Sequence, residues 1–127
     1  MLMTKESLAT AGAFTGKPVE KEVKWNKDGE DLVFTVYVRP LGYSAAVSDL
    51  LAMSGKVDAV AGRIAASICD ADGKPVFTVG DITGEADPER GPLDGELTTS
   101  LLAVIGEVNG LGKLKTSPKR KRSGANS

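Results

Sequence analysis

Residues 18–40 read PVEKEVKWNKDGEDLVFTVYVRP, and this stretch decides the fold of the amino-terminal half. On both sides of Asp28-Gly29, apolar residues fall on alternate positions, with Lys21 as the one break before the turn, and many of them are β-branched or aromatic, which is typical of strands. An Asp-Gly pair accepts the positive φ angles that a two-residue hairpin turn requires. Pro40 lacks a backbone N–H and therefore ends the second strand. The stretch predicts an antiparallel β-hairpin.

The second strand of this predicted hairpin carries apolar side chains on both of its faces. One face holds Leu32, Phe34, Val36 and Val38. The other face holds Val33, Thr35, Tyr37 and Arg39. Because a core covers only one face well, we expect Trp25, Phe34 and Tyr37 to stay partly exposed. Exposed aromatic residues favour contacts with other proteins.

Beyond Tyr43 the apolar spacing changes from two residues to three and four, which predicts helices. A first helix is expected over 44–54, with Ser44 as its N-cap and Gly55 closing it in the left-handed conformation. A second helix is expected over 57–68. The two could instead be one longer helix that is interrupted at the glycine.

Two further helices are expected towards the carboxyl end. Thr78 and Asp81 have the spacing of a capping box and predict a short helix. A longer helix is expected from Pro92, which suits the first helical position, to a glycine C-cap at Asn109-Gly110. Its apolar face comprises Leu93, Leu97, Leu101, Val104, Ile105 and Val108.

These elements predict one α+β domain over 17–112, in which a β-hairpin packs on three to four short helices. Residues 1–16 are expected to form a flexible arm whose one anchor is Phe14. Residues 113–127 hold six basic residues and no acid, and they are expected to form a disordered basic tail. Residues 1–112 hold 10 basic and 17 acidic residues, a balance of −7 that the formal net charge of −1 conceals.

The chain offers little for catalysis or metal binding. It has no histidine and one cysteine, so the usual general base and the usual zinc ligand sets are missing. Cys69 ends an apolar stripe, which favours a small buried side chain over a reactive thiol. Asp70, Asp72 and Gly73 resemble part of a calcium loop, but Lys74 stands at a ligand position, so we interpret the segment as a turn. We predict no enzyme, no cofactor and no metal.

The single cysteine, the absence of a long apolar run and the early charges Lys5 and Glu6 favour the cytoplasm and predict no membrane partner. The run Lys119–Arg122 could contact nucleic-acid phosphates. No aromatic residue is interleaved with it, so a solvated tail is the preferred interpretation.

Four segments in this order resemble the tail assembly chaperones of long-tailed bacteriophages and prophages. They are AGAFTGKPVEKEVKW (11–25), FTVYVRPLGY (34–43), RIAASICDADGKPVF (63–77) and TSLLAVIGEVNGL (99–111). The resemblance spans about residues 7–112. It implies a small, non-enzymatic protein that self-associates, and it implies that RIAASICDADGKPVF is a helix end followed by a turn.

The resemblance also implies the partners. Such chaperones coat the tape-measure protein while tail-tube subunits assemble around it in the host cytoplasm, and they are absent from the mature virion. In relatives a frameshift can extend the carboxyl end. We place the partner-binding surface on Trp25, Phe34, Tyr37, Leu50, Leu51 and Met53. The alternatives are a minor tail or tail-completion protein that stays in the virion, and a small nucleic-acid-binding protein that uses the basic tail.

Overall fold

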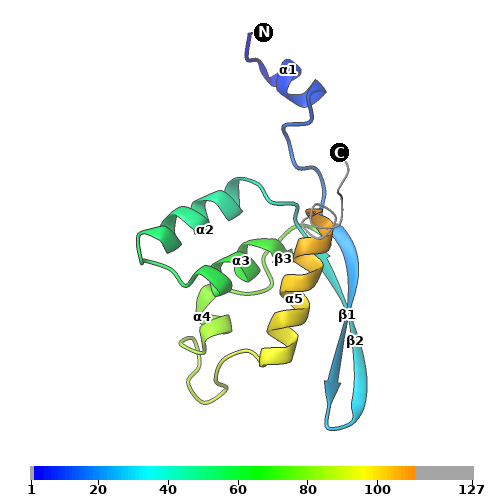
Figure 1. Ribbon diagram of the computed structural model, residues 1–127, viewed down its shortest axis with the longest axis vertical. Helices are drawn as coiled ribbons and strands as arrows, with labels where there is room; N and C mark the ends of the chain where they lie inside the picture. Colours follow the sequence, from blue (N-terminus) through cyan, green and yellow to red (C-terminus); the bar gives the residue numbers. More distant parts are fainter. Residues whose placement is uncertain (1, 111–127) are drawn as a thin grey trace, which may run out of the picture.

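The computed structural model describes residues 2–110, which form a three-stranded antiparallel sheet and five helices (Figure 1). This arrangement confirms the predicted α+β class and its amino-terminal hairpin. The elements are α1 (Lys5–Thr10), β1 (Val19–Lys27), β2 (Glu30–Val38), α2 (Tyr43–Met53), α3 (Ala59–Ser67), β3 (Ile68–Cys69), α4 (Val79–Thr83) and α5 (Gly95–Val108).

The hairpin of β1 and β2 forms as the alternation predicts. Its two-residue turn uses Asp28 at φ 54° and Gly29 at φ 82°, both in the left-handed region that Asp-Gly tolerates. Val23 lies opposite Phe34 across the two strands, in the middle of the pairing. Residues that lie directly opposite each other share a face of the sheet, so this register fixes which side chains point to the core.

A third strand, β3, was not predicted. The helix expected to continue through Ile68 ends at Ser67, and the next two residues pair with Tyr37 and Val38 of β2. Ile68 and Cys69 are both buried in this strand. A two-residue strand has no period of its own, and its partners lie 30 and 32 residues earlier, so local spacing could not reveal it.

The core lies between one face of the hairpin and the helices α3 and α5. Figure 1 shows α5 running along the hairpin, with α2, α3 and α4 on its other side. The buried apolar residues of this core are Val23, Val38, Ala61, Ile64, Ile68, Ile82, Leu101, Val104 and Ile105. Three of them belong to α5, which confirms the predicted apolar face of this helix.

The start of α5 differs from the prediction. Asp94 is the N-cap, and its carboxylate accepts a hydrogen bond from the backbone N–H of Leu97, so Pro92 lies outside the helix. A carboxylate that fixes the first turn outweighs the preference of proline for a first helical position. At the other end, the side chain of Asn109 accepts a hydrogen bond from Leu41 N at 2.6 Å, which ties α5 to the end of the hairpin.

The segment after the hairpin forms two helices, α2 and α3, separated at Gly55 with φ 77°. This confirms the first of the two predicted arrangements. Ser44 was the wrong N-cap, because α2 begins after Gly42 and has no side-chain cap. The N-cap of α3 is Asp58, whose carboxylate accepts a hydrogen bond from Ala61 N.

The amino-terminal arm contains one short helix, α1, which a reciprocal capping box between Thr4 and Ser7 begins. None of its residues is buried, and Figure 1 shows the arm leading away from the body. Phe14 is exposed, so the prediction that it anchors the arm was wrong. The predicted tail over 113–127, with its run Lys119–Arg122, lies outside the described residues.

Candidate functional site

Helix α2 presents its large apolar side chains to solvent and its small ones to the protein. Ala45 is buried, whereas Tyr43, Leu50 and Met53 are 85%, 65% and 83% exposed. Residues three, four and seven apart share a side of a helix, so the exposed residues form one continuous patch. We call this patch the α2 surface, and it consists of Tyr43, Val47, Leu50, Leu51 and Met53.

The small side of α2 packs closely on α3. At Gly62 of α3, a Cβ atom would meet the side chains of Ser48 and Val57, so this face of α3 leaves little room for a larger residue. Arg63 of α3 donates to both carboxylate oxygens of Asp49 on α2, at 3.0 and 3.1 Å. These contacts fix which side of α2 faces outward.

The six residues predicted to bind a partner divide between two regions. Leu50, Leu51 and Met53 lie together on the α2 surface. Trp25, Phe34 and Tyr37 lie on the hairpin, which is on the far side of α3 and α5 in Figure 1. The prediction missed Tyr43 and Val47, although their positions seven and three residues before Leu50 were a usable signal.

The hairpin residues have different surroundings. The indole Nε1 of Trp25 donates to Asp94 at 2.9 Å, so this side chain links β1 to the start of α5. Lys27 lies over the same ring, 5.8 Å from its centroid. Tyr37 points to the opposite face of the sheet, because residues of β2 alternate between faces. Trp25 therefore has a clear structural role beside any role in binding.

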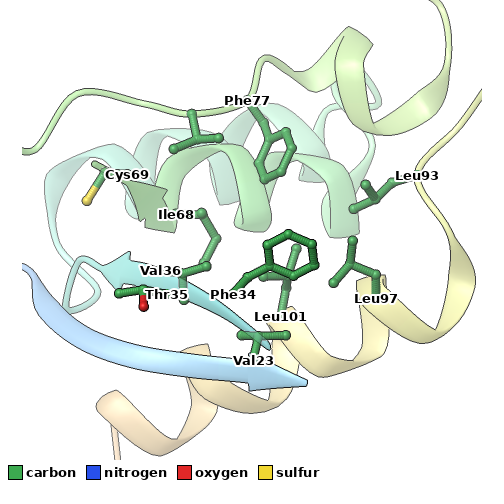
Figure 2. Close-up of a pocket in the computed structure, with 11 residues that line it drawn as sticks. Val23, Phe34, Thr35, Val36, Ile68, Cys69, Phe77, Leu93, Leu97 and Leu101 are labelled. Carbon is green, nitrogen blue, oxygen red and sulfur yellow. The ribbon is translucent and has the colours of Figure 1, made fainter. Parts of the chain in front are cut away.

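Phe34 lies at an apolar groove between the hairpin and α5. Figure 2 shows its ring among Leu97, Leu101 and Phe77, and the groove has a volume of about 320 Å³. A second groove of about 350 Å³ continues from it towards Trp25 and shares the side chains of Phe77 and Leu97. The Phe34 side chain is 44% exposed, so part of this apolar lining meets solvent.

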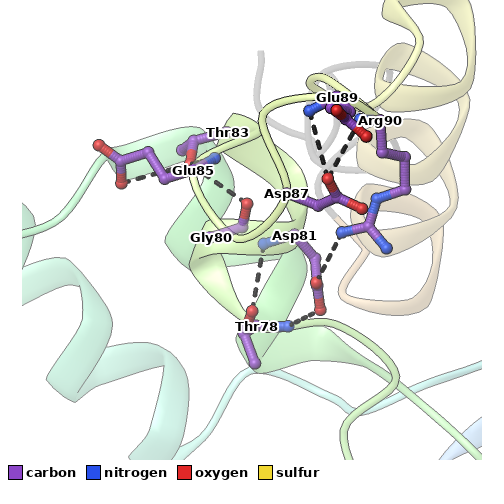
Figure 3. Close-up of polar contacts among 8 residues, drawn as sticks. All are labelled: Thr78, Gly80, Asp81, Thr83, Glu85, Asp87, Glu89 and Arg90. Carbon is purple, nitrogen blue, oxygen red and sulfur yellow. Dashed lines mark hydrogen bonds and ion pairs between the residues drawn. The ribbon is translucent and has the colours of Figure 1, made fainter.

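Polar contacts gather in the loop around α4, as Figure 3 shows. Thr78 and Asp81 cap each other reciprocally, which confirms the predicted capping box, and Arg90 donates to Asp81 at 2.9 Å. The backbone N–H of Thr78, and then Arg90, hold the pKa of Asp81 below its ordinary value. A carboxylate that is kept ionised in this way is a poor general acid or base at neutral pH, so these contacts organise a loop.

The segment that resembles a calcium loop is a turn, as predicted. One carboxylate oxygen of Asp70 accepts hydrogen bonds from the backbone N–H groups of Asp72 and Lys74, both at 2.9 Å. Cys69 is buried, as predicted, and its thiol lies 3.5 Å from the carbonyl oxygen of Tyr37. Within residues 2–110, no group of three or more potential ligand side chains is placed to hold a metal ion.

Two findings bear on the class of protein. Among the helices of the described part, none has the length and apolar character needed to span a bilayer. The sequence model of the phage tail assembly chaperones (TAC) matches residues 6–109, which is most of the chain, and the protein belongs to this family. Comparisons with curated proteins and with solved structures gave no significant match.

Proposed function

We propose that this tail assembly chaperone binds the tape-measure protein through the α2 surface and helps to recruit tail-tube subunits around it. The observation that carries the proposal is the orientation of α2, which packs its small residues inward and leaves Tyr43, Leu50 and Met53 outside. A core helix would bury such side chains. Apolar side chains gathered on one exposed face favour binding to a partner.

The shape of the surface suits a helical apolar segment of the tape-measure protein. From Tyr43 to Met53 the helix rises about 15 Å, which is the length of three turns of a partner helix laid beside it. Met53 is unbranched and adaptable, so it can pack against different segments of a long chain. Each contact is small and reversible, and several copies of the chaperone bound along one tape measure would supply the net affinity.

We also propose where the chaperone acts and when it is released. The chaperone acts by binding, without catalysis, in the cytoplasm of the bacterial host, and it leaves before the virion is complete. Mass spectrometry of purified particles tests the last point against the alternative of a minor tail or tail-completion protein. We expect tail-tube and tape-measure peptides from these particles and at most traces of this chain.

Co-expression with a tape-measure fragment tests the binding surface. We expect the wild-type chaperone to keep the fragment soluble, and we expect Met53→Glu to lose most of this effect because it places a charge in the apolar contact. The matched control is Met3→Glu, since Met3 is 78% exposed but lies in the arm, away from α2. Circular dichroism of each variant checks that both remain folded.

Equal loss of fragment solubility in the two variants would contradict the α2 surface as the binding site. If the folded wild-type protein fails to solubilise the fragment at all, the proposal of tape-measure binding is wrong. The other predicted contacts, Trp25, Phe34 and Tyr37, are proposed to contribute only secondarily, because they lie on a different side of the molecule.

A further inference from the structure

Strand β2 has an open edge along most of its length. Its other edge pairs with β1 throughout, but β3 reaches only Tyr37 and Val38, so residues 30–36 have no neighbouring strand there within the described chain. Arg39 N donates to Ser67 O on the β3 side. Alternate residues of a strand aim their backbone groups at the same edge, so Val33 and Thr35 offer N–H and C=O groups along this open side.

The apolar groove lies directly beside this edge. It is lined by Phe34 and Thr35 of β2, by the end of β3 and by Leu97 of α5, and Figure 2 shows these side chains around it. A strand added at the edge would place alternate side chains over this groove. The open backbone groups are therefore able to pair with an extended segment, and the groove favours a segment that is apolar on one face.

We propose that the open edge of β2 pairs antiparallel with β2 of a second copy, about a two-fold axis at Val33. This register uses all seven open residues, because Glu30 then lies opposite Val36 of the partner subunit. It also places Leu32 opposite Phe34 of the partner subunit on the face that carries the grooves. Phe34 thereby gains apolar contact where it is now exposed.

The charges on the strand fit this register. Asp31 lies opposite Thr35 of the partner subunit, and Glu30 lies opposite a valine, so no like charges meet across the interface. A register centred on Asp31 would oppose two carboxylates. On the other sheet face, Val33 is 53% exposed beside polar neighbours such as Lys24 and Thr35, and it would lie against Val33 of the partner subunit.

This interface goes beyond tape-measure binding, and its test does not depend on that function. A dimer joined at β2 would carry two α2 surfaces, because α2 lies away from the hairpin (Figure 1). The experiment measures self-association of the purified full chain alone. Failure of tape-measure binding would leave its result unchanged, and the reverse is also true.

Charge substitutions at the two-fold axis test the interface, because residue 33 lies there opposite residue 33 of the partner subunit. We expect the wild-type chain and Val33→Thr to associate with increasing concentration in sedimentation velocity. Val33→Lys and Val33→Glu each oppose like charges and should weaken association by about tenfold or more. An equimolar mixture of these two variants should recover association, since lysine then faces glutamate.

Three outcomes would overturn the proposal: a wild-type chain that stays monomeric at the highest concentration, charged variants that associate like Val33→Thr, or a mixture that does not recover. The last outcome would show that residue 33 does not lie opposite residue 33 of the partner subunit. Thermal unfolding of each variant separates loss of the interface from loss of the fold.

Discussion

Helices α2 and α5 both carry apolar residues at helical spacing, but they use them in opposite ways. Helix α5 buries Leu101 and Ile105 against the hairpin and α3. Helix α2 packs through Ala45 and leaves Leu50 and Met53 in solvent. The same helical spacing of apolar residues therefore produces a buried face in α5 and an exposed face in α2.

The difference comes from what each helix packs against. The hairpin offers the apolar side chains of Val23, Val36 and Val38, and the large residues of α5 pack against them. Helix α3 offers Gly62, against which the small Ser48 side chain of α2 packs, so only small side chains of α2 fit there. A helix that packs through its small side keeps its large side available for another protein.

Replacing a leucine by alanine should change the free energy of unfolding very differently in the two helices, and this is the largest effect that we predict. Leu101→Ala removes a buried side chain and should lower the free energy of unfolding by about 2–5 kcal/mol, because the cavity cannot fully close. Leu50→Ala removes an exposed side chain and should change it by less than about 0.5 kcal/mol. Urea denaturation monitored by the fluorescence of Trp25 measures both.

The two substitutions should affect binding to the tape-measure fragment in the opposite order from their effects on stability. Leu50→Ala should weaken the rescue of a tape-measure fragment, whereas any folded fraction of Leu101→Ala should retain it. If Leu50→Ala proves as destabilising as Leu101→Ala, then Leu50 is buried in the purified protein, and the contrast between the helices disappears.

Local patterns in the sequence predicted the elements whose causes are local. The hairpin follows from period-2 alternation around Asp28-Gly29, and the capping box follows from Thr78 and Asp81. The apolar face of α5 follows from its spacing. The start of α5 was misplaced because Asp94, rather than a proline, supplies the hydrogen bond that begins it.

The features that depend on distant partners could not be predicted in the same way. Strand β3 exists because Ile68 and Cys69 pair with β2, whereas the spacing of Ile68 alone fitted the expected helix over 57–68. Leu50, Leu51 and Met53 of α2 are exposed in the structure, but spacing alone does not say which side of a helix is covered. The predicted surface was divided in two because Trp25 and Phe34 lie on the hairpin, far from α2 in the fold.

The close contact between α2 and α3 can be tested through Gly62. Gly62→Ala adds a methyl group against the Ser48 hydroxyl and should lower the free energy of unfolding by about 1–3 kcal/mol, although alanine itself favours the helix. The double variant Gly62→Ala/Ser48→Ala should recover part of this loss, since the closest atom is gone. Thermal and urea unfolding measure the coupling.

Additive effects of these two substitutions would contradict the close packing that turns the large side of α2 outward. The matched control is Gly106→Ala in α5, where a Cβ atom meets open space, so this variant should gain a little stability from the better helix former. The two Gly→Ala variants should therefore change stability in opposite directions, because Gly62 lies in the contact between α2 and α3 and Gly106 does not.

The smallest effect concerns how the two helices begin. Helix α2 starts at Gly42 without a side-chain cap, whereas α5 starts at Asp94, which also holds the indole of Trp25. The backbone N–H of Leu97, with the Trp25 hydrogen bond as a weaker cause, lowers the pKa of Asp94 from its ordinary value. Because the folded pKa is the lower one, the carboxylate stabilises the fold above the unfolded pKa of about 3.9, and this stabilisation is lost as pH falls through the folded pKa.

Asp94→Ala should therefore lower Tm by about a few degrees at pH 7, and its difference from the wild type should shrink as the pH is taken below about 4. The control, Glu89→Ala, removes an acid from an exposed loop without touching a helix cap, and its Tm should follow the wild type at every pH. A difference for Asp94→Ala that stays constant down to pH 2 would mean that the ionised carboxylate does not fix the start of α5. The firm attachment of α5, in contrast to the uncapped α2, would then rest on its buried apolar face alone.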